Sequence, residues 1–503
     1  MDAMDIPQPV IYDKNTINEM LEPYGAQTIN HQKQVSRTTE NENLKTNFLK
    51  ITEFKDRPNK GKTLDILNTH LLYNTDNFET MKNRCDITVL SKHQMDNYKY
   101  MYQTPNEKFE VLVDRMDTFA EVICKHYALE LDAMADPAMS SQSEIFTLGR
   151  ICCDSEGKMN SNSIILEPLP TLGGKGVKLV LNNLSSYALF PGQIVGIQGF
   201  NTLGQELIVT KIFEIPLLPM CRTRSGTVID YNYGPTKLNG NPLKVIIAAG
   251  PYTLDSGLEF EPLLELLNKV KIEKPNVLIL MGPFIHEDHP LIQEGEMENT
   301  PGETFRRCIS QPLKKFMDNL PEIKVVVIPS IKDICHHHLA FPQPPFDKSG
   351  LPPETICFPN PVQFQINEII FSICNVDVLC NIYREEVSTT DKAERIFRTS
   401  HHILTQRHLY PLFPPSPGEV NLDLKHSSSL DLLYTPDVLI LPSKLKHFAK
   451  IIDNVICINP GYLAKGLNTY AKMVIHPFPQ ELANEADVEH FVHKRTRVEI
   501  VRL

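Results

Sequence analysis

The stretch Val277-Leu-Ile-Leu-Met-Gly-Pro-Phe284 joins five consecutive apolar residues to a Gly-Pro pair. A run of this kind, in which polar and apolar residues do not alternate, is typical of a strand that is buried on both faces of a sheet. Similar runs lie at residues 245–249, 325–328, 438–441 and 455–458. Between the first two runs, residues 258–271 place leucines at helical spacing, which predicts a β-α-β unit. The second half of the chain is therefore predicted to be an α/β domain.

The positions just after these strands are where an α/β domain usually carries its chemistry. In this chain prolines and glycines predominate there, and a proline side chain offers neither a metal ligand nor a backbone N–H. The strand-end positions are Gly250, Pro251, Gly282, Pro283, Pro329, Ser330, Pro442, Ser443, Asn459, Pro460 and Gly461. We predict that no catalytic residue, metal ligand or cofactor lies at these positions.

These strand ends resemble a degenerate form of the calcineurin-like metallophosphoesterase family. That family carries Asp-x-His, Gly-Asp and Gly-Asn-His at successive strand ends, because two bridged metals need carboxylates and imidazoles. Here Gly282-Pro283 stands where Gly-Asp is expected, and Pro329-Ser330 stands where Gly-Asn is expected. The resemblance implies that the fold is kept and that the metal centre is lost.

Five strand-like runs precede this domain, at residues 144–153, 163–167, 177–181, 193–199 and 206–213. Their number, shortness and turn-rich connections predict a five-strand barrel of the OB type, and a small sandwich or a side sheet of the α/β domain is the alternative. Residues 144–216 carry slightly more acidic than basic side chains. This balance favours a barrel that contacts protein over one that binds single-stranded nucleic acid.

The chain length of 503 residues exceeds what one hydrophobic core usually serves. We predict a polar, largely flexible N-terminal arm over 1–97, with short helices near 17–21 and 64–72. An amphipathic helix and linker follow over 98–143, with the helix running from 107 to 134. The barrel is predicted over 144–225 and the inactive phosphoesterase-like domain over 226–503.

The composition sets limits on the class of protein. Fifty Lys and Arg against 61 Asp and Glu give a net charge of −11, which argues against coating nucleic-acid phosphates by overall charge. Eleven cysteines without a C-x-x-C motif predict free thiols. Apolar runs of about five residues are too short for a membrane span, so we expect a soluble intracellular protein.

A barrel followed by an inactive phosphoesterase domain in one acidic chain resembles the B subunits of replicative DNA polymerases, and among them the polymerase α–primase branch. The resemblance covers residues 98–503. The motifs that carry it are Leu148-Gly-Arg-Ile-Cys-Cys-Asp, Leu189-Phe-Pro-Gly-Gln, Ala249-Gly-Pro-Tyr-Thr, Leu280-Met-Gly-Pro-Phe, Val327-Ile-Pro-Ser-Ile-Lys-Asp, Phe341-Pro-Gln-Pro-Pro-Phe, His402-Ile-Leu-Thr-Gln-Arg, Tyr434-Thr-Pro-Asp-Val-Leu-Ile-Leu-Pro-Ser and Ile458-Asn-Pro-Gly-Tyr-Leu-Ala-Lys-Gly.

The resemblance implies a non-catalytic nuclear subunit that binds the C-terminal region of the polymerase α catalytic subunit. Through that complex it implies association with the small and large primase subunits, with telomere-maintenance or replisome factors, and indirectly with DNA. The implied process is RNA–DNA primer synthesis at replication initiation, on the lagging strand and on the telomere C-strand. The expected interface lies near two proline-rich loops, 341–346 and 410–417, which we interpret as rigid surface loops.

The alternative function is a metal-dependent phosphoesterase or nuclease. Three histidine-rich places could serve it, at His286-Glu-Asp-His289, at residues 336–338 and at His401-His402. The first lies several residues beyond its strand, and no Asp-x-His accompanies it at residues 248–251. Surface or hydrogen-bonding roles are therefore favoured for these histidines.

Overall fold

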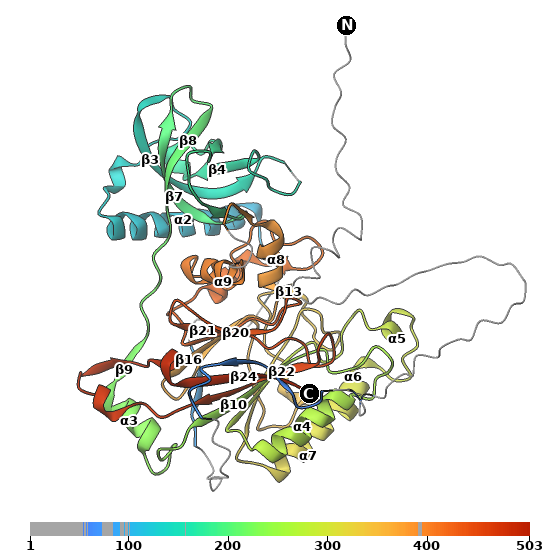
Figure 1. Cartoon of the computed structure of the whole chain (residues 1–503). Coiled ribbons are helices and arrows are strands. Elements are labelled where there is room, and N and C mark those ends of the chain that lie inside the picture. Colours follow the sequence, from blue (N-terminus) through green and yellow to red (C-terminus); the bar gives the residue numbers. More distant parts are fainter. Residues whose placement is uncertain are drawn as a thin grey trace, which may run out of the picture.

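The computed structural model describes residues 54, 57, 59–72, 84–90, 95, 99, 101–155, 157–390 and 395–503. A small β-barrel stands above a larger α/β unit, and helix α2 (Pro105–Tyr127) lies between the barrel and that unit (Figure 1). No helix among the described residues is long and apolar enough to span a membrane.

Five strands close the barrel in the order β3-β4-β5-β8-β7. Their bounds are β3 Ser141–Cys153, β4 Ile164–Pro168, β5 Val177–Val180, β7 Ile194–Asn201 and β8 Glu206–Phe213. Ile151, Leu166 and Leu207 fill its interior without exposure to solvent. Gly199 lets two strands approach closely, because a Cβ atom there would clash with the Ile208 carbonyl oxygen. The predicted five-strand barrel is confirmed.

Helix α2 closes one end of the barrel. Its first turn has a capping box in which Thr104 and Glu107 satisfy each other's backbone N–H groups. Its buried face, which includes Met116, Phe119 and Ile123, packs on barrel residues. The predicted end at residue 134 is wrong, because Ala128 adopts a left-handed conformation that terminates the helix at Tyr127.

The α/β unit contains two sheets. The first has the order β1-β24-β22-β10-β11-β12-β14, and the second has the order β2-β15-β16-β19-β21-β20. The bounds of the first are β1 Thr63–Leu67, β24 Thr496–Arg502, β22 Thr469–Ile475, β10 Leu243–Ala249, β11 Val277–Met281, β12 Lys324–Ile328 and β14 Ile356–Cys357. Those of the second are β2 Ile87–Val89, β15 Val362–Ile366, β16 Ile369–Ile373, β19 Val438–Ile440, β21 Val455–Asn459 and β20 Phe448–Ile452. The five predicted strands are confirmed, and they divide between the two sheets.

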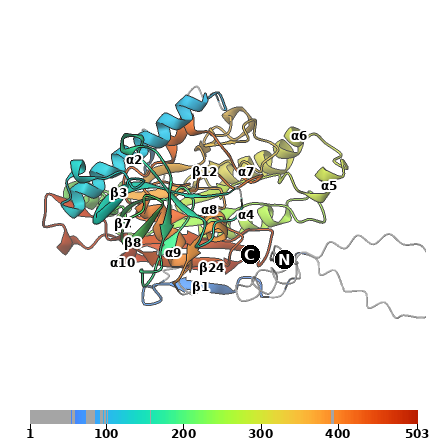
Figure 2. The same cartoon turned by 90° about the horizontal axis from the view of Figure 1, so that it is seen from above.

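Helices cover the outer faces of both sheets, so the unit has four layers (Figures 1 and 2). Helices α4 (Glu261–Glu273) and α7 (Gln311–Asn319) lie on the first sheet, and α8 (Val378–Glu385) and α9 (Arg395–Thr405) lie on the second. A continuous apolar layer fills the space between the sheets. Burial on both faces explains why these strands read as unbroken apolar runs.

Smaller elements complete the unit and its links to the barrel. The helices are α3 Ser225–Tyr233, α5 Pro290–Gln293, α6 Pro301–Phe305 and α10 Val492–Arg495. The short strand pairs are β6 Ala188–Leu189 with β17 Val387–Ser388, β9 Arg222–Arg224 with β23 Asp487–Glu489, and β13 Ala340–Phe341 with β18 Asn421–Leu422.

The N-terminal region contributes a strand to each sheet. Strand β1 pairs antiparallel with β24, and strand β2 pairs antiparallel with β15. The Asp65 carboxylate of β1 also accepts a hydrogen bond from the Ala449 backbone in β20. The helix predicted near 64–72 and the flexible character of this part of the arm are therefore wrong. The helix predicted near 17–21 lies outside the described residues.

The first proline-rich loop is buried, and the second is buried only in its first half. Phe341 and Phe346 are buried in the apolar clusters of the α/β unit. Pro411 and Leu412 are buried as well, and the Phe413 backbone N–H donates to the Pro191 carbonyl of the barrel. The interpretation of residues 341–346 as a surface loop is wrong, because they pack inside the molecule. In the second loop residues 410–412 are buried, whereas Pro414 and Pro417 are exposed, so its second half lies at the surface as predicted. The partner interface expected near them stays a prediction.

Deleting residues 1–97 should destabilise the α/β unit, because it removes β1, β2 and the buried side chains of Phe54 and Cys85. We expect its apparent melting temperature to fall by about 5 °C or more relative to a 54–503 chain, which retains both strands. Differential scanning calorimetry of the two truncated chains measures this difference. Equal melting temperatures would show that the two strands contribute little.

Candidate functional site

The carboxyl ends of the parallel strands from both sheets meet at one edge of the α/β unit. Strands β10, β11 and β12 run parallel in the first sheet, and β16, β19 and β21 run parallel in the second. The predicted degenerate positions follow these strands. A Cβ atom on Gly250 would clash with the Pro283 carbonyl oxygen, so two of the strand-end loops touch there through their backbones.

The buried side chain of Asn375, just past β16, joins the two sheets at this edge. Its amide nitrogen donates to the carbonyl oxygens of Gly282 and Pro329, at 3.0 and 2.9 Å. Its backbone N–H donates to the Asn360 side-chain oxygen at 2.9 Å. Beside it, Gln343 donates to the Ser330 carbonyl at 3.1 Å. Side-chain amides therefore satisfy the backbone groups of Gly282, Pro329 and Ser330.

A second set of contacts fixes the ends of β19 and β21. The Asn459 side-chain oxygen accepts from the backbone N–H groups of Ser443 and Gly461, both at 3.0 Å. The Asp377 carboxylate accepts from the Ser443 hydroxyl at 2.6 Å and from the Lys444 backbone at 2.8 Å. Asp377 also caps α8 by accepting from the Cys380 backbone. Burial raises the pKa of Asp377, while these donors oppose that rise.

A second carboxylate at this edge, Asp333, is fully buried. It accepts hydrogen bonds from the backbone N–H groups of Phe284, Ile285 and Cys335. Burial raises its pKa to about 6 despite these donors. Its oxygens are directed at the loops that they fix, so this carboxylate holds the backbone after β11 and β12 in place.

The histidines named from the sequence have structural contacts. The two ring nitrogens of His289 contact the Leu291 N–H and the Leu254 carbonyl, which places the imidazole as the cap of α5. His286 accepts from the Asp288 backbone, and burial lowers its pKa to about 4. The His336 ring bonds to the backbone of His338. Over the described part of the chain, no three His, Cys, Asp or Glu side chains are grouped so that they could hold a metal ion.

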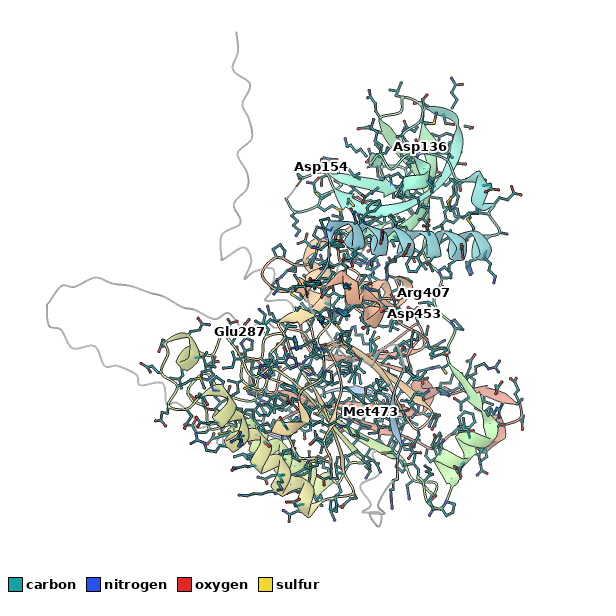
Figure 3. All side chains as sticks on the ribbon, turned by 180° about the vertical axis from the view of Figure 1, so that it is seen from behind. Asp136, Asp154, Glu287, Arg407, Asp453 and Met473 are labelled. Carbon is teal, nitrogen blue, oxygen red and sulfur yellow. The ribbon has the colours of Figure 1, made fainter. Side chains whose placement is uncertain are left out.

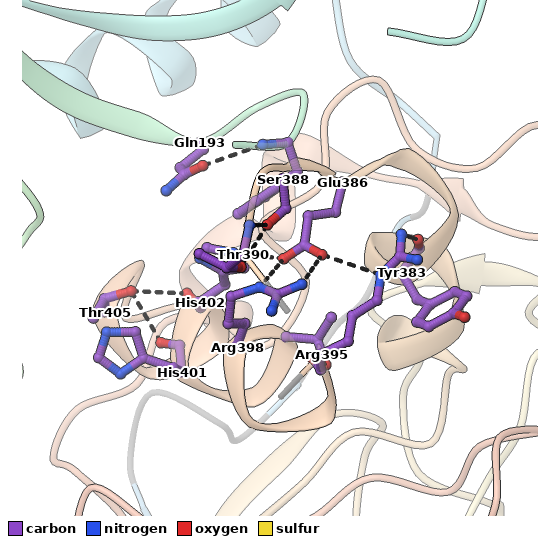
Figure 4. Close-up of polar contacts among 12 residues, drawn as sticks. Gln193, Tyr383, Glu386, Ser388, Thr390, Arg395, Arg398, His401, His402 and Thr405 are labelled. Carbon is purple, nitrogen blue, oxygen red and sulfur yellow. Dashed lines mark hydrogen bonds and ion pairs between the residues drawn. The ribbon is translucent and has the colours of Figure 1, made fainter. Parts of the chain in front are cut away.

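His401 and His402 lie elsewhere, at the junction between α9 and the barrel. His402 contacts the buried Glu386 carboxylate, which also pairs with Arg395 and Arg398 at 3.1 and 2.9 Å (Figure 4). Burial acts to raise the pKa of Glu386, but His402 and Arg398 lower it to about 2. This cluster holds the chain just before β17, the strand that pairs with β6 of the barrel segment.

Further polar contacts join the barrel to the α/β unit at the level of Arg407 and Asp453 (Figure 3). The buried Gln406 amide both accepts from the Ile194 N–H and donates to its carbonyl, each at 2.9 Å, as a neighbouring strand would. The Arg407 guanidinium donates twice to the Pro216 carbonyl, at 3.1 and 2.7 Å. His401 lies between Asp453 of the α/β unit and Glu214 of the barrel, at 2.5 and 3.3 Å.

Sequence reasoning missed the residues that organise both places. Asn375 and Asp377 follow the mostly apolar stretch Ile369–Ile373. That stretch could have predicted a further strand, with these two residues just past its end. Glu386 carries no comparable signal, because a lone carboxylate has no characteristic spacing. Gln406 lies in the quoted motif His402-Ile-Leu-Thr-Gln-Arg, but nothing in that motif indicates that its partner is Ile194 of the barrel.

Replacing Asn375 by alanine should destabilise the α/β unit. The change leaves the buried carbonyls of Gly282 and Pro329 without a donor, so we expect a loss of about 2 to 4 kcal/mol. Replacing the exposed Asn106 is the matched control and should change stability by less than about 0.5 kcal/mol. Urea unfolding followed by circular dichroism measures both. Similar midpoints for the two variants would contradict the role of Asn375.

The contact of His401 with Asp453 and Glu214 should make stability depend on pH. Burial opposes protonation, but the two carboxylates raise the pKa of His401 from 6.5 to about 9. Since the folded value is the higher one, this stabilisation is complete below pH 6.5 and is lost as the pH rises through 9.

We therefore expect His401→Gln to lower the melting temperature at pH 6.5 by a few degrees, roughly what a loss of about 1 kcal/mol produces. The difference from the unmodified chain should shrink towards pH 10. The exposed His337→Gln is the control and should show no such convergence. A difference for His401→Gln that is constant from pH 6 to pH 10 would contradict this assignment.

Comparison with known proteins places both folded units in one family. The family model for the B subunit of DNA polymerase alpha/epsilon matches residues 245–450, and the model for the OB domain of the DNA polymerase alpha B subunit matches residues 109–215. The DNA polymerase alpha B subunit of Schizosaccharomyces pombe is 34% identical over 88% of this chain and 79% of that protein. Its counterparts from Rattus norvegicus and Saccharomyces cerevisiae are each 33% identical to this chain, over 77% and 80% of its length, respectively. The chain covers 64% of the first of these proteins and 65% of the second, just under two thirds of each. The barrel is thus an OB domain, and the chain belongs to the family of DNA polymerase alpha B subunits.

Proposed function

We propose that this chain is a non-catalytic accessory subunit of the DNA polymerase α–primase complex. It binds the C-terminal region of the catalytic subunit and supports RNA–DNA primer synthesis in the nucleus, at replication initiation, on the lagging strand and on the telomere C-strand. Family membership supports the assignment to that complex, since the relatives are named as subunits of DNA polymerase alpha.

The observation that carries the non-catalytic part of this proposal is the use of the polar groups at the strand ends. Asp333 and Asp377 each accept three hydrogen bonds, from backbone N–H groups and, for Asp377, also from a hydroxyl, and Asn375 donates to backbone carbonyls. A metal-dependent phosphoesterase needs carboxylates and imidazoles that converge on open space. We accordingly interpret the α/β unit, residues 226–503 with β1 and β2, as an inactive phosphoesterase-like domain.

The remaining function is the provision of a rigid binding surface. The contacts of Gln406, Arg407 and His401 fix the barrel, residues 144–225, on the α/β unit. A partner that touches both units then meets them in one fixed arrangement and loses little entropy to their relative motion. Permanent complexes of this kind usually bury more than roughly 2,000 Å². The primase subunits and DNA are reached through the catalytic subunit, and residues 98–143 connect the barrel to the preceding strands.

Co-purification tests this proposal. The full chain, co-expressed with the polymerase α catalytic subunit of the same organism, should be retained on the tagged catalytic subunit and lost when its C-terminal region is removed. The Gln406→Ala and Arg407→Ala double variant should bind about tenfold more weakly, because the two units are no longer fixed together. The exposed Asn484→Ala serves as the control.

The competing function predicts a different set of results. Retention that does not depend on the C-terminal region would contradict the proposed interface. Manganese-dependent hydrolysis of bis(4-nitrophenyl) phosphate by the purified chain, abolished by His286→Ala, would contradict the non-catalytic assignment and support a phosphoesterase.

A further inference from the structure

The N-terminal turns of α2 extend the apolar face of this helix beyond the part that the barrel covers. Met116 is buried on that face, but Leu112 and Val113, one turn earlier, are only half-buried. Phe109, at the start of the same face, keeps 56% of its surface exposed. Figure 2 shows α2 near the edge of the molecule, and the exposure of Phe109 shows that solvent reaches this end of its apolar face.

The exposed end of this face forms one wall of a groove, which we call the α2 groove. Phe109, Leu112, Val113 and Met116 line it from the helix, and Pro168 and Pro170 line it from the barrel, around a volume of about 160 Å³. Arg150 and Glu167 form an ion pair at its barrel side. An apolar side chain from a partner would bury the exposed Phe109 ring here, and removing apolar surface from water is favourable.

An acidic stripe runs along another face of α2, about 120° around the helix from the residues that line the α2 groove. Glu110, Asp114, Asp117 and Glu121 follow one another at steps of four, three and four residues, so they share one face of the helix. All four are exposed, and none of them forms an ion pair with a Lys, Arg or His of the described residues. Like charges at these spacings repel each other, and a cationic partner would relieve that repulsion.

We propose that the α2 groove and the acidic stripe dock a segment of another protein that places an apolar side chain in the groove and lysines or arginines along the stripe. The charge of the stripe selects this occupant. Nucleic acid would be repelled by it, and a second copy of this chain would bring two acidic stripes together. Acidic side chains outnumber basic ones over residues 1–53 as a whole, but residues 44–50 carry two lysines and no acidic residue, so this part of the chain is the competing occupant that the experiment distinguishes.

Docking at the α2 groove is separate from the proposed function. The interface with the catalytic subunit can exist while the α2 groove is empty, and the groove can be occupied by a different subunit or factor. A test must therefore detect the segment that contacts α2 itself.

Site-specific photo-crosslinking tests the proposal on the full chain, expressed in its own cells. The photoreactive residue p-benzoylphenylalanine replaces Phe109, and mass spectrometry identifies the crosslinked peptide. We expect one segment from another polypeptide in which basic residues outnumber acidic ones. The same residue in place of Leu203, an exposed barrel residue outside the α2 groove, should not crosslink to that segment.

A charge variant tests the role of the stripe separately. Glu110→Gln, Asp114→Asn, Asp117→Asn and Glu121→Gln, combined with the photoreactive residue, should reduce the yield of this adduct about fivefold at physiological salt. The matched control neutralises exposed carboxylates away from α2, with Glu294→Gln, Glu296→Gln and Glu298→Gln, and should leave the yield unchanged. No adduct, an adduct to residues 1–53 or to a second copy, an acidic or neutral segment, or a yield insensitive to the stripe would each overturn the proposal.

Discussion

Backbone carbonyls at the ends of the buried strands are shielded from water and need hydrogen-bond donors from the protein. This requirement determines which side chains lie at the edge where the strands of both sheets end. Asn375 supplies two donors from one side chain, to carbonyls that follow two different strands of the opposite sheet. An unsatisfied buried carbonyl would cost about 1 to 3 kcal/mol, so each such contact is a large part of the net stability of a domain. The apolar layer holds the sheets face to face, and these amides fix how the sheets align.

The same requirement accounts for the contacts of the carboxylates at this edge. A carboxylate that accepts from backbone N–H groups, as Asp333 and Asp377 do, is held in one orientation by the loops that it stabilises. Freeing either carboxylate for a ligand would leave those N–H groups unpaired. The loops after β11, β12 and β19 therefore depend on side chains that would have to be released before any ligand could use them.

The parts of this structure that the sequence predicted are those with a local pattern. Val277–Met281 and its neighbours are apolar throughout because both faces are covered, and that pattern needs no knowledge of the partners. Strand β1 was missed because its five residues are only partly buried and its partner β24 lies at the other end of the sequence. The proline-rich segment 341–346 was assigned to the surface from its composition, yet Phe341 and Phe346, which flank its prolines, are buried in the apolar clusters of the α/β unit. Asn375 and Gln406 act through distant backbone groups, which no spacing rule describes.

The pairing of β1 with β24 has a consequence for how the protein is made. More than 400 residues separate Leu67 from Thr496, so at a synthesis rate of about 5 to 20 residues per second the first strand waits on the order of 20 to 90 s for its partner. During that time the hydrogen-bonding edge of β1 that pairs with β24 has no partner strand. The OB domain can close early in synthesis, whereas the first sheet cannot be completed until residue 502 has left the ribosome. A chain stalled before that point would present an unpaired strand, which is the feature that chaperones and degradation pathways recognise in incomplete proteins.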